Sequence, residues 1–110
     1  MENESAIKEL YSTILDRKEN GEEGSYTVYL FNKGTKKILK KVGEECTEVV
    51  ISALAESKED QVNEISDLTY HLLVLMAQLD IPVEMVEEEL KKRANKINNF
   101  KGERKEIKNY

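Results

Sequence analysis

Residues 35–55 read TKKILKKVGEECTEVVISALA, and residues 57–79 read SKEDQVNEISDLTYHLLVLMAQL. Apolar residues recur in both stretches at spacings of three and four, which is typical of amphipathic helices. Ser57 has the side chain of a helix N-cap, with Asp60 three residues later in the place of the capping-box acid. The sequence therefore predicts two long helices in succession. The second is so rich in apolar residues that we expect it to be the most buried element, with its polar stripe facing an enclosed cleft.

Shorter helices are expected on both sides of this pair. A first helix spans about residues 5–18, and a glycine-rich turn at residues 20–24 follows it. The next run, YTVYLF, could form a strand. However, Ser25 before it and Gly34 after it are a typical cap and terminator, and they favour a short helix in an otherwise helical chain.

A last helix is expected to begin near Pro82, because proline is tolerated in a first turn, with Asp80 as its cap. Its apolar residues predict a face that packs on the other helices or on a second subunit: Val83, Val86, Leu90, Ala94 and Ile97. Residues 99–110 lack this periodicity, so we expect them to form a frayed basic tail. The alternative is that some cations of this tail contact phosphate groups.

Length and composition limit the fold and exclude several classes of protein. The chain has 110 residues, one proline, one cysteine and a net charge of −5. We expect a single domain over residues 1–110, an all-α bundle of four or five helices, and a homodimer that buries further apolar surface. The charge argues against a nucleic-acid binder, and no apolar run could span a membrane, so we expect a cytoplasmic protein. Cys46 is expected to be a core residue, not a nucleophile.

An acidic cluster lies on the first long helix. At about 100° per residue, Glu44, Glu45 and Glu48 fall within one arc that borders the apolar face. Lys37 and Lys41 project into the same arc, where they either contact phosphate or neutralise the glutamates. For any one of these residues alone, a solvated surface is the simpler interpretation.

The second long helix carries a matching polar stripe, formed by Asp60, Glu64, Asp67 and His71. Like charges one turn apart destabilise a helix, and carboxylates removed from water cost more, so a divalent cation would relieve both penalties. Magnesium prefers oxygen ligands and combines a few carboxylates with phosphate oxygens. The two acidic groups lie on the two most hydrophobic helices, where a solvated face should be narrow. A magnesium site is therefore an alternative to the interpretation that these acids form a solvated surface. His71 itself is expected to be hydrogen-bonded at the rim of the core.

The sequence resembles a known enzyme family over nearly its whole length. The matching motifs are Ser25-Tyr26-Thr27, Lys41-Val42-Gly43-Glu44-Glu45, Glu48-Val49-Val50-Ile51, Glu64, Asp67-Leu68 and Tyr70-His71-Leu72-Leu73-Val74-Leu75. They resemble phosphoribosyl-ATP pyrophosphohydrolase, the second enzyme of histidine biosynthesis. They also resemble the wider MazG-like all-α superfamily, whose mark is Glu-Glu-x-x-Glu followed at a distance by Glu-x-x-Asp.

The resemblance implies specific roles for the acidic residues. It implies that Glu45, Glu48, Glu64 and Asp67 bind Mg²⁺, with Glu44 as a further acidic residue of the site. The implied reaction is hydrolysis of phosphoribosyl-ATP between its α and β phosphates, which gives phosphoribosyl-AMP and pyrophosphate. We expect Glu44 or Glu45 to take the proton of the attacking water.

Two other functions are consistent with the same sequence. A MazG-like relative would cleave other nucleoside triphosphates with the same metal site, and a helical interaction module would keep the fold without catalysis. Tyr26 and Tyr29 either line a nucleotide pocket or pack the short helix, and packing is the simpler expectation.

Overall fold

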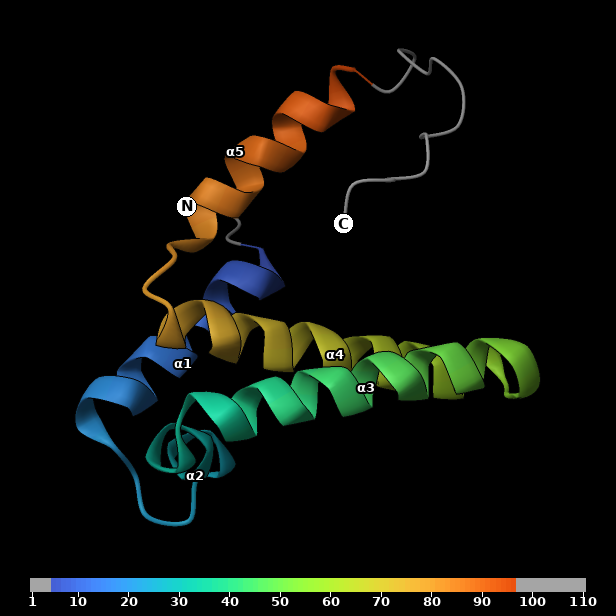
Figure 1. The fold of residues 1–110 in the computed structure, drawn as a ribbon. Helices are drawn as coiled ribbons and strands as arrows, with labels where there is room; N and C mark the ends of the chain where they lie inside the picture. The colour runs from blue at the N-terminus through green and yellow to red at the C-terminus, as the bar shows by residue number, and fades with distance from the viewer. Residues whose placement is uncertain (1–4, 97–110) are drawn as a thin grey trace, which may run out of the picture.

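The computed structural model describes residues 5–96, and every regular element in this range is a helix (Figure 1). The helices are α1 (Ala6–Asn20), α2 (Tyr26–Lys33), α3 (Thr35–Ala55), α4 (Lys58–Gln78) and α5 (Val83–Ala94). The predicted all-α bundle of four or five helices is confirmed, and the YTVYLF run is helical. The predicted basic tail and Ile97 lie outside the described residues. None of the helices in residues 5–96 is long and apolar enough to cross a membrane.

Serine caps and a glycine determine where several helices begin and end. Ser5, Ser25 and Ser57 each accept a hydrogen bond from the backbone N–H three residues later, and so begin α1, α2 and α4. Gly34 ends α2 and directly begins α3, with a φ of 94° that residues with a Cβ rarely adopt. Because one residue joins the two helices, the chain turns sharply there, and Figure 1 shows α2 nearly end-on next to the beginning of α3, which is seen from the side.

The core lies at one end of a long hairpin. α3 and α4 run antiparallel and side by side, and α1 and α2 lie against the end of the hairpin where α3 begins and α4 ends (Figure 1). The buried apolar residues are Tyr11, Ile14, Leu30, Ile38, Leu73, Val74, Ala77 and Val83. The opposite end of the hairpin, around the loop at residues 56–57, extends beyond this core.

As expected, α4 supplies more buried residues than any other described helix, but its two halves differ in burial, and its polar stripe, which includes the exposed Asp60, does not face an enclosed cleft along its length. Its second half supplies the buried residues His71, Leu73, Val74 and Ala77. In its first half, Val62 and Ile65 are exposed. The reason is the position of α1 and α2, which cover only the second half of this helix (Figure 1).

The line along which α3 packs on α4 is partly polar. Glu45 and Ser52, seven residues apart, lie on this line, and Glu45 is partly buried at the border of the apolar core, as expected. Gln61 Nε2 donates to the Ser52 carbonyl at 3.1 Å, near the loop. Gln78 Nε2 donates to Thr35 Oγ1 at 2.8 Å, at the covered end. Hydrogen bonds between the two helices therefore fix their register at both ends.

Several apolar side chains of α3 lie to one side of this packing line. Cys46 and Val50 are exposed, so the expectation that Cys46 belongs to the core is wrong. The physical reason is that α4 covers one side of this part of α3 and leaves the side with Cys46 open.

The connection from α4 to α5 also differs from the prediction. Pro82 occupies the N-cap position of α5 and provides no side-chain cap, so Asp80 is not the cap. Asp80 instead has a φ of 59°, and its carboxylate lies 3.4 Å from Lys18 Nζ. α5 projects away from the hairpin (Figure 1), and Val86 and Leu90 on its apolar face are exposed.

Candidate metal and phosphate site

Three carboxylates from the two long helices meet within the α3–α4 hairpin. Glu45 on α3 and Glu64 and Asp67 on α4 each offer one oxygen, and these oxygens all lie within 4.8 Å of one another. We call these three residues the acidic triad. Glu64 and Asp67 are one helical turn apart, and the antiparallel packing brings Glu45 opposite to them. The structure thus brings together three of the four expected magnesium ligands.

The electrostatics of the triad favour a bound cation. Desolvation raises the pKa of Glu64, and the negative charges of Glu48, Asp67 and Glu45 raise it further. Only 12% of the Glu45 side chain is exposed. Partly desolvated carboxylates that repel one another are stabilised by a proton or by a cation, and a set made only of oxygen atoms suits Mg²⁺. The residues present therefore fit this metal.

The remaining expected acids lie beside the triad. Glu48 is exposed, and its carboxylate is not one of the three convergent groups, although its charge acts on Glu64. Glu44 has a side chain that is 50% exposed, and its carboxylate lies 3.4 Å from Lys41 Nζ. Glu44 is thus accessible to water, and Glu48 lies close enough to the triad to influence it.

The two expected phosphate-binding lysines lie between the triad and α2. Lys41 Nζ is 3.7 Å from the Glu45 carboxylate as well as close to Glu44. Desolvation lowers the pKa of Lys41, but Tyr26, Glu44 and Glu45 raise it by more, so the net shift is upward. Lys37 Nζ lies 6.0 Å from the centre of the Tyr29 ring. Lys41 therefore neutralises part of the acidic cluster, while Lys37 faces an aromatic ring.

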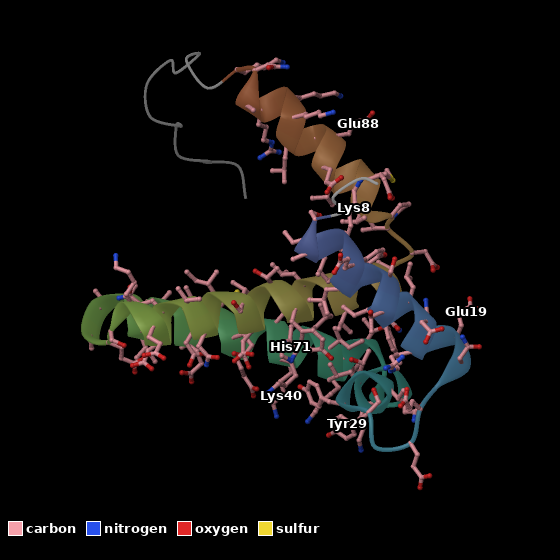
Figure 2. All side chains as sticks on the ribbon, turned by 180° about the vertical axis from the view of Figure 1, so that it is seen from behind. Lys8, Glu19, Tyr29, Lys40, His71 and Glu88 are labelled. Atoms are coloured by element: carbon pink, nitrogen blue, oxygen red, sulfur yellow. The ribbon has the colours of Figure 1, made fainter. Side chains whose placement is uncertain are left out.

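A buried histidine connects α2 to the turn of α4 that carries Asp67. His71 Nδ1 lies 2.8 Å from the Asp67 carbonyl oxygen, and a carbonyl only accepts, so Nδ1 carries the proton. His71 Nε2 then accepts from Tyr26 Oη at 2.9 Å. The expectation of a hydrogen-bonded histidine at the core rim is confirmed, and Figure 2 places it at the part of the hairpin near α2.

Tyr70 belongs to a motif that carries the family resemblance, but the sequence did not predict a separate role for it. Its ring stacks on Tyr26 with the centres 6.1 Å apart, and its hydroxyl is hydrogen-bonded to Thr27. The available signal was the position of Tyr70 directly before His71, in a chain whose short helix begins with Tyr26-Thr27. Tyr70 therefore helps to fix α2 against the hairpin beside the site.

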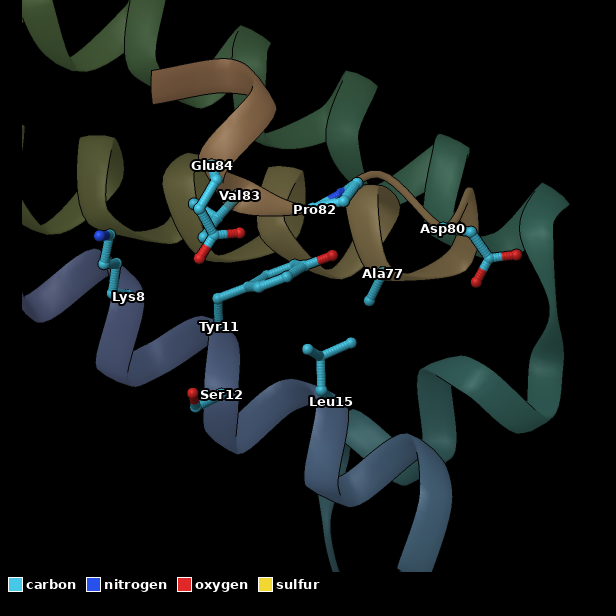
Figure 3. Close-up of a pocket in the computed structure, with 9 residues that line it drawn as sticks. All are labelled: Lys8, Tyr11, Ser12, Leu15, Ala77, Asp80, Pro82, Val83 and Glu84. Atoms are coloured by element: carbon cyan, nitrogen blue, oxygen red, sulfur yellow. The ribbon is translucent and has the colours of Figure 1, made fainter. Parts of the chain in front are cut away.

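A separate pocket of about 310 Å³ lies between α1 and the connection from α4 to α5 (Figure 3). Tyr11 extends across it, and its hydroxyl donates to the Ile81 carbonyl at 2.6 Å. The pocket is lined by α1, the end of α4 and the beginning of α5, and so includes neither the triad nor Lys37 and Lys41. We assign Tyr11 a structural role, because it ties the α4–α5 connection to α1.

Known proteins are similar to this chain over nearly its whole length. The model of the family described as phosphoribosyl-ATP pyrophosphohydrolase matches residues 7–94. Proteins named phosphoribosyl-ATP pyrophosphatase from Clostridium novyi and Clostridium acetobutylicum are 52% and 53% identical to this chain, with 99% of each sequence covered. One from Listeria monocytogenes is 54% identical over 92% of this chain and 96% of its own length. The chain therefore belongs to the phosphoribosyl-ATP pyrophosphohydrolase family.

Proposed function

We propose that this protein hydrolyses phosphoribosyl-ATP to phosphoribosyl-AMP and pyrophosphate, the second step of histidine biosynthesis, with Mg²⁺ as its cofactor. The main support is the convergence of three carboxylate oxygens within 4.8 Å of one another, in a chain more than half identical to proteins named phosphoribosyl-ATP pyrophosphatase. The family match over residues 7–94 also supports our proposal that residues 1–110 form a single catalytic domain.

The acidic triad would hold the metal ion. Glu45, Glu64 and Asp67 supply three oxygen ligands, and Glu48, one turn after Glu45, is our candidate for a fourth. Bound there, Mg²⁺ would neutralise negative charge on the phosphate oxygens and on the leaving pyrophosphate. The ion would also relieve the repulsion that raises the pKa of Glu64.

The neighbouring side chains would position the phosphates and accept a proton. Glu44 and Glu45 hold the ammonium group of Lys41 in place, so an entering phosphate would share this cation with the two carboxylates. Lys37 lies one helical turn before Lys41 and could contact the same phosphates. Glu44 is our first candidate for the base that accepts the proton of the attacking water, since it lies outside the triad and is half exposed. Glu45 is the alternative base.

We also propose that two copies associate through the apolar side of the hairpin, formed by Leu39, Cys46, Val50, Ile65 and Leu72. Viewed down its own axis, each helix has a reference residue that faces the other helix: Glu45 on α3 and Glu64 on α4. The apolar residues lie roughly 80–140° around the helix from that reference, in the same direction on both helices. Because the helices are antiparallel, both sets lie on one side of the hairpin, away from Glu44 and Glu48. Two hairpins that pack through this side would form a four-helix bundle, which covers apolar surface that a small single chain leaves in water.

The test of the proposed activity is pyrophosphate release in the presence and absence of Mg²⁺. Phosphoribosyl-ATP would be compared with ATP and with a panel of deoxynucleoside triphosphates. We expect release from phosphoribosyl-ATP only, and only with Mg²⁺. Comparable release from the panel would instead indicate a MazG-like enzyme with broader substrates, and no release from any compound would indicate a non-catalytic interaction module.

A further inference from the structure

The short helix α2 presents exposed aromatic rings next to the site. Tyr26 and Tyr29 are 42% and 41% exposed, and their rings stack with the centres 5.9 Å apart. Tyr70 also stacks on Tyr26, with the ring centres 6.1 Å apart. Tyr26 and Tyr29 also line a groove of about 850 Å³. Packing of α2 accounts for the buried Leu30, but it does not account for two exposed rings that line an open groove.

The two exposed tyrosines differ in what holds them. The Tyr26 hydroxyl is bound to His71 Nε2, so this ring serves as a fixed support. Tyr29 stacks on that support, and Lys33 Nζ and Lys37 Nζ lie 5.9 Å and 6.0 Å from its ring centre. These distances are at the outer limit of cation–π contacts, so the flexible lysine side chains can move aside for a ligand. Figure 2 shows Tyr29 at the α2 end of the molecule, below His71.

A continuous series of groups connects this ring to the acidic triad. Lys37 faces Tyr29, and Lys41 follows Lys37 after four residues, about 6 Å along the helix axis. Lys41 in turn lies within 3.7 Å of both Glu44 and Glu45. The order along the surface is therefore an aromatic ring, two cations and a cluster of carboxylates, which matches the order of base, phosphates and metal in a nucleotide complex.

Two acidic residues of the groove indicate which way a bound nucleotide would point. Glu22 and Glu23 line the groove beside Tyr26 and Tyr29; Glu22 pairs with Arg17 at 3.2 Å, and the carboxylate of Glu23 disfavours a phosphate there. The phosphates of a bound nucleotide would instead point toward Lys37 and Lys41, where the charge is positive.

We propose that Tyr29 is the platform on which the adenine base of the substrate stacks, with the polyphosphate extending past Lys37 and Lys41 to the acidic triad. The inference rests on the proposed function and deepens it, because it names the residue that holds the base. Stacking uses the face of a base and leaves its edge free. A base held by its face therefore keeps its edge accessible to the phosphoribosyl group that distinguishes phosphoribosyl-ATP from ATP.

The first test compares Tyr29→Leu, which removes the ring, with Tyr29→Phe, which keeps it. For phosphoribosyl-ATP we expect Tyr29→Leu to raise KM by about tenfold or more, because loss of an aromatic platform weakens the binding of a base by such factors. The value of kcat should change by less than about threefold, since the ring does not touch the reacting phosphates. Tyr29→Phe should restore KM to within about threefold of the wild type. Lys36→Met, a change at an exposed lysine of the same helix turn as Lys37, is the matched surface control.

A second test measures binding without turnover. AMP would be titrated into the magnesium-free wild-type protein, and the ring signals of the tyrosines followed by NMR. We expect the Tyr29 ring signals to shift, with weaker binding in Tyr29→Leu and unchanged binding in Lys36→Met. Circular dichroism melting would verify that the variants fold.

The outcomes separate this inference from the proposed function. Wild-type turnover of phosphoribosyl-ATP combined with an unchanged KM in Tyr29→Leu would overturn the platform and leave the activity intact. AMP that leaves the Tyr29 signals unmoved would also overturn it. Failure of the wild-type protein to release pyrophosphate from phosphoribosyl-ATP would overturn the proposed function and this inference with it.

Discussion

The two ends of the α3–α4 hairpin are built in different ways. At the end covered by α1 and α2, Leu30, Ile38 and Val74 are fully buried. At the open end, Val50 and Leu54 are 60% and 84% exposed. At the covered end the chain itself completes a buried core, so we expect this end to provide most of the folding stability. The remainder of the hairpin leaves apolar groups in water and gathers carboxylates. We infer that it is adapted to partners from outside the chain: a second copy, a cation and a phosphorylated substrate.

The largest expected effect on stability lies at the covered end. Leu30→Ala should lower the free energy of unfolding by about 2–5 kcal/mol, because it leaves a cavity among fully buried side chains. Leu54→Ala at the open end should change it by less than about 0.5 kcal/mol, because that side chain is already in water. Urea denaturation of both variants measures the difference. Equal losses of unfolding free energy in the two variants would show that the two ends contribute equally to stability.

An intermediate effect is expected on association. Sedimentation of the wild type should give a mass of twice the 12.7 kDa of one chain. Val50→Asp would place a charge in the proposed interface and should raise the dimer dissociation constant by at least about tenfold. Leu54→Asp is the matched control, since Leu54 is exposed but lies outside the apolar side of the hairpin. A monomeric wild type, or equal effects of the two variants, would remove this interface.

The smallest expected effect is a dependence of stability on pH in the absence of metal. The pKa of Glu64 is raised in the folded chain, so the folded state binds this proton more tightly than the unfolded state does. The contribution of Glu64 to stability should therefore fall as the pH rises from the ordinary glutamate pKa of 4.5 through the raised value. Glu64→Gln should remove this part of the pH dependence, and Glu59→Gln, at an exposed residue of the same helix, should not.

Thermal melts in a chelator across this pH range measure the effect. Mg²⁺ should raise the melting temperature of the wild type, and more at neutral pH than at acidic pH, because protons compete with the metal for the carboxylates. A pH profile that is the same for the wild type and Glu64→Gln would contradict the assigned pKa shift.

Local signals in the sequence were sufficient to predict where most helices begin and end. Ser25 and Ser57 act as caps through hydrogen bonds to neighbouring backbone groups, and Gly34 ends a helix because of its own backbone conformation. The spacing of Glu45, Glu64 and Asp67 likewise placed the acids on helix faces that turned out to meet. These features depend on residues close in the chain, or on the regular pitch of a helix.

The features that the sequence did not predict depend on which element covers which side. Cys46 lies on an apolar side of α3, but its burial depends on whether another element packs there. The same holds for the first half of α4, where Val62 and Ile65 look like core residues in sequence. Asp80 looked like a cap, but its backbone turned it toward Lys18. The row of rings at Tyr26, Tyr29 and Tyr70 required the fold to bring two distant segments together.

We predict that the acidic triad holds the magnesium ion on which pyrophosphate release depends. The most direct test measures release from phosphoribosyl-ATP as a function of Mg²⁺ concentration for the wild type, Glu64→Gln and Glu59→Gln. We predict that Glu64→Gln lowers the rate at saturating Mg²⁺ by at least about 100-fold and weakens the response to Mg²⁺, while Glu59→Gln behaves as the wild type. A Glu64→Gln variant with wild-type rate and wild-type Mg²⁺ dependence would contradict the assignment.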